Sequence, residues 1–140
     1  MFDLCYNVIN KRKTYLKCIY VRYYMKVAVI GSRGITVPDL TPYLPENTTE
    51  IVSGGAKGVD SCAKEYALAH GIPLTEFLPE YSRYGRSAPL KRNFQIIEYA
   101  DFVLAFWDGQ SRGTNHVIGF CEKTGKPIRV IRSESDSTAP

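Results

Sequence analysis

The sequence predicts a single α/β domain built on a doubly wound parallel sheet. Two observations predict it: short apolar runs alternate with segments of helical hydrophobic spacing, and a glycine or proline marks most of the junctions. Strands that alternate with helices form parallel β-α-β units, whose crossovers are right-handed. We therefore expect about five strands in the Rossmann-like order 3-2-1-4-5, with helices on both faces of the sheet.

The first two expected strands are short and apolar. Residues 27–30 form the first run, which ends at Gly31, and residues 50–53 form the second, which ends at Gly54. Apolar runs of this length are typical of strands that are buried on both faces of a parallel sheet.

A helix and a third strand follow. Apolar residues recur at helical spacing from Val59, and Gly71 stands where a helix would receive its C-terminal cap. Residues 73–78 predict the third strand, with a proline at its first position, where a missing N–H is tolerated. Residues 79–89 are rich in Tyr, Arg, Ser and Gly, and we expect a loop there.

The second half repeats the alternation. Helical spacing predicts a helix over residues 90–100, and the fully apolar residues 102–106 predict a central strand. The next helix runs from about Thr114 and ends at Gly125. Residues 128–131 form the last expected strand.

Both ends of the chain differ from this domain, which we assign to residues 25–132. Residues 1–24 mix basic residues with tyrosines and show no clear period. Met25 directly precedes the first strand, so we expect a natural start there and an extension upstream, with an added strand or a basic arm as alternatives. Residues 133–140 are short and polar, and we expect a disordered tail.

Composition and charge bound the function. The chain has 140 residues, 44% hydrophobic and 23% charged, which suits one globular domain. The net charge of +4 arises from residues 1–24, because residues 25–140 carry 13 basic and 13 acidic side chains. This balance argues against nucleic acid as a partner. No apolar run approaches a membrane helix, no basic-then-apolar leader is recognised, and the cysteines form no C-x-x-C pair, so we expect a cytoplasmic protein without a metal site.

Three loops with small, polar and basic residues follow the first, second and fourth strands. The carboxyl ends of parallel strands share one edge of the sheet, so these loops should meet there. Glycine-rich turns and helix N-termini bind anions, and arginine binds phosphate in a bidentate manner. We therefore expect a ligand that bears phosphate, bound by Gly31, Ser32, Arg33, Ser53, Gly54, Gly55, Ala56, Lys57, Gly58, Arg92, Asn93, Asp108, Gly113 and Thr114.

Each loop taken alone also fits an ordinary strand-to-helix turn, where glycine, serine and aspartate accumulate. Asp60 is a candidate functional carboxylate, but in the first turn of a helix it also complements the helix dipole. Asp108 can face a ligand or cap the next helix. The convergence of three loops at one edge favours a binding site.

The ordered motifs resemble the SLOG superfamily, specifically its YspA-type members related to YpsA. The resemblance rests on Gly31-Ser32-Arg33, Ser53-Gly54-Gly55-Ala56-Lys57-Gly58-Val59-Asp60, Lys91-Arg92-Asn93, residues 100–106 and Gly113-Thr114, over residues 25–131. It implies a Rossmann-like domain that binds a nucleotide or a nucleotide-derived ligand, such as an ADP-ribose-like or NAD-like molecule, with no cofactor fixed.

Two more distant resemblances give alternatives. The LOG phosphoribohydrolases cleave the N-glycosidic bond of nucleoside monophosphates, but where they carry a glutamate three residues after the threonine this chain has Val117. The DNA-processing protein DprA shares the Ser-Gly-Gly-Ala-x-Gly-x-Asp run and binds single-stranded DNA.

Four functional expectations result. A nucleotide-binding module comes first, and a hydrolase on the same site, with Asp108, Asp60 or Glu80 as acid or base, comes second. Contact of DNA with the basic arm of residues 1–24 is the third. We also expect a homo-oligomer, because Trp107, Phe120 and the tyrosine-rich residues 81–86 leave apolar surface.

Overall fold

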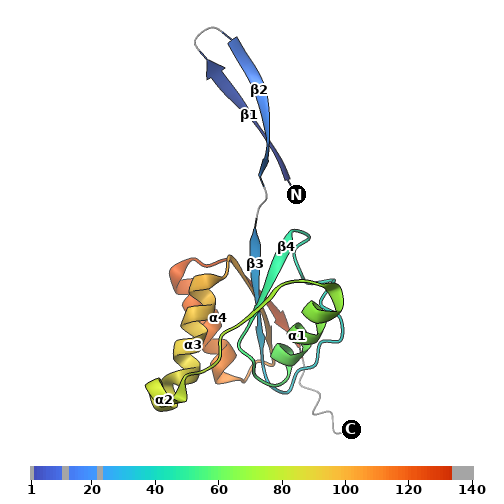
Figure 1. The fold of residues 1–140 in the computed structure, drawn as a ribbon. Helices are drawn as coiled ribbons and strands as arrows, with labels where there is room; N and C mark the ends of the chain where they lie inside the picture. The colour runs from blue at the N-terminus through green and yellow to red at the C-terminus, as the bar shows by residue number, and fades with distance from the viewer. Residues whose placement is uncertain (1, 11–12, 22–23, 134–140) are drawn as a thin grey trace.

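The computed structural model describes residues 2–10, 13–21 and 24–133, and these residues form two sheets (Figure 1). The larger sheet has five parallel strands in the spatial order β5-β4-β3-β6-β7. Counted within this sheet alone, the order is 3-2-1-4-5, so the predicted topology is confirmed. The strands are β3 (Met25–Gly31), β4 (Thr48–Ser53), β5 (Leu74–Glu76), β6 (Phe102–Trp107) and β7 (Ile128–Arg132).

Helices cover both faces of this sheet. Helix α1 (Val59–His70) lies on one face, and α3 (Ala88–Tyr99) and α4 (Arg112–Thr124) lie side by side on the other (Figure 1). Side chains of a strand alternate between faces, and β3 shows this directly. Val27 and Val29 pack in the core under α1, whereas Ala28 and Ile30 pack under α3 and α4. Burial of both faces explains why residues 27–30 of this strand are all apolar.

The predicted loop over residues 79–89 is wrong in part. Tyr81–Tyr84 form a short helix, α2, and Gly85–Ser87 a 3₁₀ turn, η1, which lead into α3. The carbonyl of Glu80 accepts hydrogen bonds from the backbone N–H groups of Arg83 and Tyr84. A single turn has no hydrophobic period, so the sequence pattern does not reveal it. As a result α3 begins at Ala88, two residues before the predicted start, with a proline in its first turn.

The described residues 2–10 and 13–21 form more regular structure than their sequence indicates. Strands β1 (Phe2–Asn10) and β2 (Lys13–Val21) form an antiparallel hairpin, with Phe2 opposite Val21 and Asn10 opposite Lys13. Figure 1 shows the hairpin extending beyond the amino end of β3. The two strands pair with each other in a sheet of their own and do not extend the larger sheet.

The described residues test only part of the predictions about the C-terminal tail and about membrane helices. Residues 134–140 of the predicted tail lie outside the described residues. Among the described helices, none has the length and apolar character needed to cross a bilayer.

Candidate functional site

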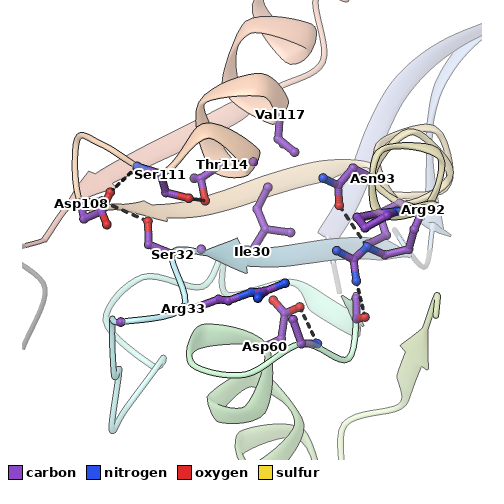
Figure 2. A pocket seen from close by; sticks show the side chains of 17 residues that line it. Ile30, Ser32, Arg33, Asp60, Arg92, Asn93, Asp108, Ser111, Thr114 and Val117 are labelled. Atoms are coloured by element: carbon purple, nitrogen blue, oxygen red, sulfur yellow. Dashed lines mark hydrogen bonds between the residues drawn. The ribbon is translucent and has the colours of Figure 1, made fainter. Parts of the chain in front are cut away.

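A pocket of about 440 Å³ lies at the edge of the sheet where β3, β4 and β6 end (Figure 2). The three glycine-rich loops and one side of α3 surround it, which is the usual place for a ligand in such a sheet. Its lining residues are Ile30, Gly31, Ser32, Arg33, Gly34, Gly54, Ala56, Asp60, Pro89, Arg92, Asn93, Ile96, Asp108, Ser111, Gly113, Thr114 and Val117.

The loop after β3 is fixed by close backbone packing. A Cβ atom on Gly31 would lie 2.5 Å from Val59 Cγ2 and 2.7 Å from the carbonyl oxygen of Phe106, so only glycine fits there. Ser32 is 2% exposed; its backbone N–H donates to Phe106 O (3.0 Å), and its Oγ accepts from the backbone N–H of Asp108 (3.3 Å). These bonds join the β3 and β6 loops, while Arg33 remains exposed at the pocket.

The loop after β4 contains a buried carboxylate. Asp60, in the first turn of α1, is 6% exposed, and its Oδ2 accepts a hydrogen bond of 3.0 Å from the backbone N–H of Ala56. Burial raises the pKa of Asp60, although the hydrogen bond from Ala56 and the charge of Arg92 oppose that rise. Asp60 therefore fixes the loop and also lines the pocket.

Arg92 reaches from α3 to the β4 loop. Its Nη1 donates to the carbonyl oxygen of Gly54 (2.7 Å), and its Nε donates to Asn93 Oδ1 (3.1 Å). Burial lowers the pKa of Arg92 and Asp60 opposes this, but an arginine keeps its charge in either case. In Figure 2 the side chain of Arg33 extends toward the Arg92 side of the pocket, so both guanidinium groups border the same space.

The loop after β6 is organised by Asp108. Its Oδ1 accepts hydrogen bonds from the backbone N–H groups of Gln110 (2.8 Å) and Ser111 (2.7 Å), which lower the pKa of Asp108. Ser111 stands at the N-cap of α4, and its Oγ donates to Oγ1 of the buried Thr114 (3.4 Å). The first amides of a helix lack intrahelical acceptors, so this wall offers donors to an anion.

Five of the sequence-predicted residues lie outside the pocket lining. Ser53 is fully buried at the end of β4, Gly55 and Lys57 are exposed, and Gly58 packs with φ +80 against the backbone carbonyl of Arg33. Glu80 is exposed ahead of α2, and its Oε2 lies 3.9 Å from Arg83 Nη1. Of the three proposed acid or base carboxylates, Asp60 and Asp108 therefore line the pocket and Glu80 does not.

The pocket also contains residues outside the predicted ligand-binding set, namely Ile30, Gly34, Pro89, Ile96, Ser111 and Val117. The three aliphatic residues occupy core positions of β3, α3 and α4, and their spacing marks them only as core. Ser111 was detectable, because it belongs to the same Gly-Ser-Thr loop as Asp108 and Thr114.

The arginines and N–H donors of this arrangement suit an anion, whereas its two carboxylates, Asp60 and Asp108, oppose one when ionised. Two arginines, two buried hydroxyl groups and the start of α4 surround one concave space. No group of three or more His, Cys, Asp or Glu residues capable of holding a metal ion is found in the described part of the chain.

The fold and the site define an α/β domain with a Rossmann-like parallel sheet and a pocket at the carboxyl ends of its strands. The family model of DNA recombination-mediator protein A matches residues 19–81, which include the β3 and β4 loops. The Gene 61 protein of Mycobacterium phage D29 is 33% identical over 84 residues, covering 56% of this chain and 67% of that protein. The chain belongs to the same family as this phage protein. No solved structure matches it.

These comparisons correct the expectation about nucleic acid and leave the SLOG assignment without support. The expectation that nucleic acid is not a partner is wrong, because residues 19–81 match the family model of DNA recombination-mediator protein A. Net charge is a poor guide there, because it averages over the whole surface and does not report individual cations such as Arg33 and Arg92 at the pocket. Neither comparison extends to the SLOG superfamily or its YspA type, and that assignment, self-association and the cytoplasmic location stay predictions.

Proposed function

We propose that this chain binds single-stranded DNA and that its pocket receives one nucleotide of the strand. The observation that carries the proposal is the joint presence of Arg33 and Arg92 at a concave site beside the N-terminus of α4. The match to DNA recombination-mediator protein A supports it, because the matched residues supply Arg33 and the β4 loop.

The shape of the site supports a single nucleotide unit. A volume of about 440 Å³ falls within the range of small-molecule pockets. Ile30, Ile96 and Val117 provide an apolar surface for a base or sugar, and the arginines and loop donors suit the phosphate. A free nucleotide fits the same description and is the second candidate ligand.

The carboxylates of the pocket favour binding over hydrolysis. Cleavage of an N-glycosidic bond needs a carboxyl group that can give up a proton. Asp108 is held as an anion by two backbone N–H groups, and Val117, 2% exposed, stands where the LOG enzymes carry glutamate. The pKa of Asp60 is raised, as a general acid requires, but its Oδ2 already accepts a hydrogen bond from the backbone N–H of Ala56.

The test is fluorescence anisotropy with a labelled oligothymidylate of about 12 nucleotides, a length within the usual site size of single-strand binders. We expect the full chain to bind it, and Arg33→Gln and Arg92→Gln to weaken binding. Lys123→Gln is the matched control, because Lys123 is exposed in the last turn of α4, away from the pocket. Absence of binding by the full chain, or equal loss in all three variants, would contradict the proposal.

Thymidine monophosphate distinguishes the two candidate ligands. If the oligonucleotide binds more tightly than the mononucleotide and displaces it, a strand is the ligand. Binding of the mononucleotide alone would instead identify a free nucleotide.

A further inference from the structure

We propose a second nucleotide-contact site outside the pocket, in which Trp107 and Arg132 bind the nucleotide next to the one in the pocket. This inference rests on the proposed function and extends it from one nucleotide to a strand. The guanidinium of Arg132, held over the half-buried indole of Trp107, would pair with the backbone phosphate of that nucleotide, a contact by which proteins bind single strands.

The two side chains form one fixed unit at the end of the sheet. Trp107 and Arg132 are the last residues of β6 and β7 and lie opposite each other in the parallel register. The guanidinium carbon of Arg132 lies 5.6 Å from the centroid of the Trp107 ring. The indole Nε1–H donates to the carbonyl oxygen of Ser111 (3.1 Å), which fixes the ring relative to the start of α4.

Gly109 makes this arrangement possible. It adopts φ +85, which favours glycine, and a side chain there would collide with the guanidinium of Arg132. The β6 loop is therefore shaped to receive the arginine as well as to line the pocket.

The pair adjoins the pocket directly. Asp108, the next residue after Trp107, lines the pocket, and so does Ser111, which accepts the indole hydrogen bond. A strand that leaves the pocket over this wall would meet the Trp107–Arg132 unit next.

Arg132 has charge available for a partner. It is exposed, and no carboxylate within the described residues forms an ion pair with it. Stacking on the indole orients the planar guanidinium and leaves N–H groups at its edge for a phosphate.

Arg129 provides a matched control on the same strand. It is also exposed, and its guanidinium lies 6.0 Å from the ring centroid of Tyr43, so it repeats the arginine-over-aromatic geometry. Tyr43 and Arg129 lie outside the pocket lining, and Arg129 is opposite Leu104, deeper in the sheet. A purely structural role of such pairs would affect both arginines alike.

The experiment compares Arg132→Gln with Arg129→Gln in the full chain, with the labelled oligothymidylate and with thymidine monophosphate. We expect Arg132→Gln to weaken oligonucleotide binding about twofold to fivefold, the size of an exposed ion pair. The slope of log affinity against log salt should fall in magnitude by about 0.7, the value for one phosphate contact on a single strand. Binding of the mononucleotide should not change, and Arg129→Gln should change neither affinity.

Three outcomes would overturn the inference, and they are distinguishable. Equal oligonucleotide binding by both variants would remove the second site and leave the pocket proposal standing. Equal weakening of both ligands by Arg132→Gln would mean that Arg132 acts through the pocket. If the full chain binds neither ligand, the proposed function itself is wrong and this inference falls with it.

Discussion

Gly54→Ala should weaken ligand binding without unfolding the protein, because it acts on the guanidinium of Arg92. A Cβ atom on Gly54 would lie 2.9 Å from both Cζ and Nη1 of Arg92. Gly54 is not among the glycines with positive φ, so alanine can adopt its backbone conformation. The atoms in conflict belong to the end of a flexible side chain, which can move away.

The size of the effect follows from these distances. Carbon contacts are optimal near 3.5–4.0 Å, so the guanidinium must shift by about 0.5–1 Å. That shift disturbs its 2.7 Å hydrogen bond to Gly54 O and moves the cation away from the ligand. A hydrogen bond from the Arg92 guanidinium to a ligand phosphate would contribute about 1.5–3 kcal/mol, so its loss on displacement should lower oligonucleotide affinity roughly tenfold or more. The free energy of unfolding should change by less than about 1 kcal/mol, since alanine also lowers the entropy of the unfolded chain.

The assay combines urea denaturation with fluorescence anisotropy for Gly54→Ala, Arg92→Gln and the double variant. If alanine acts through Arg92, the double variant should bind no more weakly than Arg92→Gln alone, because the two effects are not independent. Additive losses, or unchanged binding in Gly54→Ala, would refute this reasoning.

Three further predictions concern the pocket and the hairpin. Asp60→Asn removes a carboxylate whose pKa is raised above 3.8 by burial. The original chain should lose stability as the pH rises from about 3.8 through that raised pKa, whereas the variant should not. Parallel pH profiles of the two proteins in urea denaturation would contradict the raised pKa. Gly31→Ala should lower the free energy of unfolding by about 1–3 kcal/mol, because its Cβ would collide with Val59 and with the fixed carbonyl of Phe106. An unchanged midpoint of urea denaturation would contradict this prediction. Deletion of residues 1–24 should preserve oligonucleotide binding that Arg92→Gln weakens; complete loss of binding on deletion would place the contact on the hairpin instead.

The sheet was predictable because its sequence signals are local. Residues 27–30 of β3 and all of β6 are continuous apolar runs, and glycines stand where the chain turns off β3 and β4. Parallel strands then bring their carboxyl ends to one edge, so Ser32, Gly54 and Thr114 could be assigned to a common site without coordinates.

The details of the site depend on contacts between distant residues. The hydrogen bond from Arg92 to Gly54 joins residues 38 positions apart, and no local sequence pattern around either residue predicts it. Val117 occupies a core position by its spacing, yet it also lines the pocket. The pairing of Trp107 with Arg132 required the register of β6 and β7, which a one-dimensional pattern does not contain.

The charges within the pocket favour a strand over a small anion as the proposed ligand. The charged lining residues are Arg33, Arg92, Asp60 and Asp108, so the two positive and two negative groups cancel when both carboxylates are ionised. A free phosphate placed there gains hydrogen bonds but little net attraction. A strand that continued over the β6 wall would also meet exposed cations outside the pocket, among them Arg132 and Arg112 at the start of α4. Each added phosphate contact releases counterions, so affinity should grow with the number of nucleotides that span this edge.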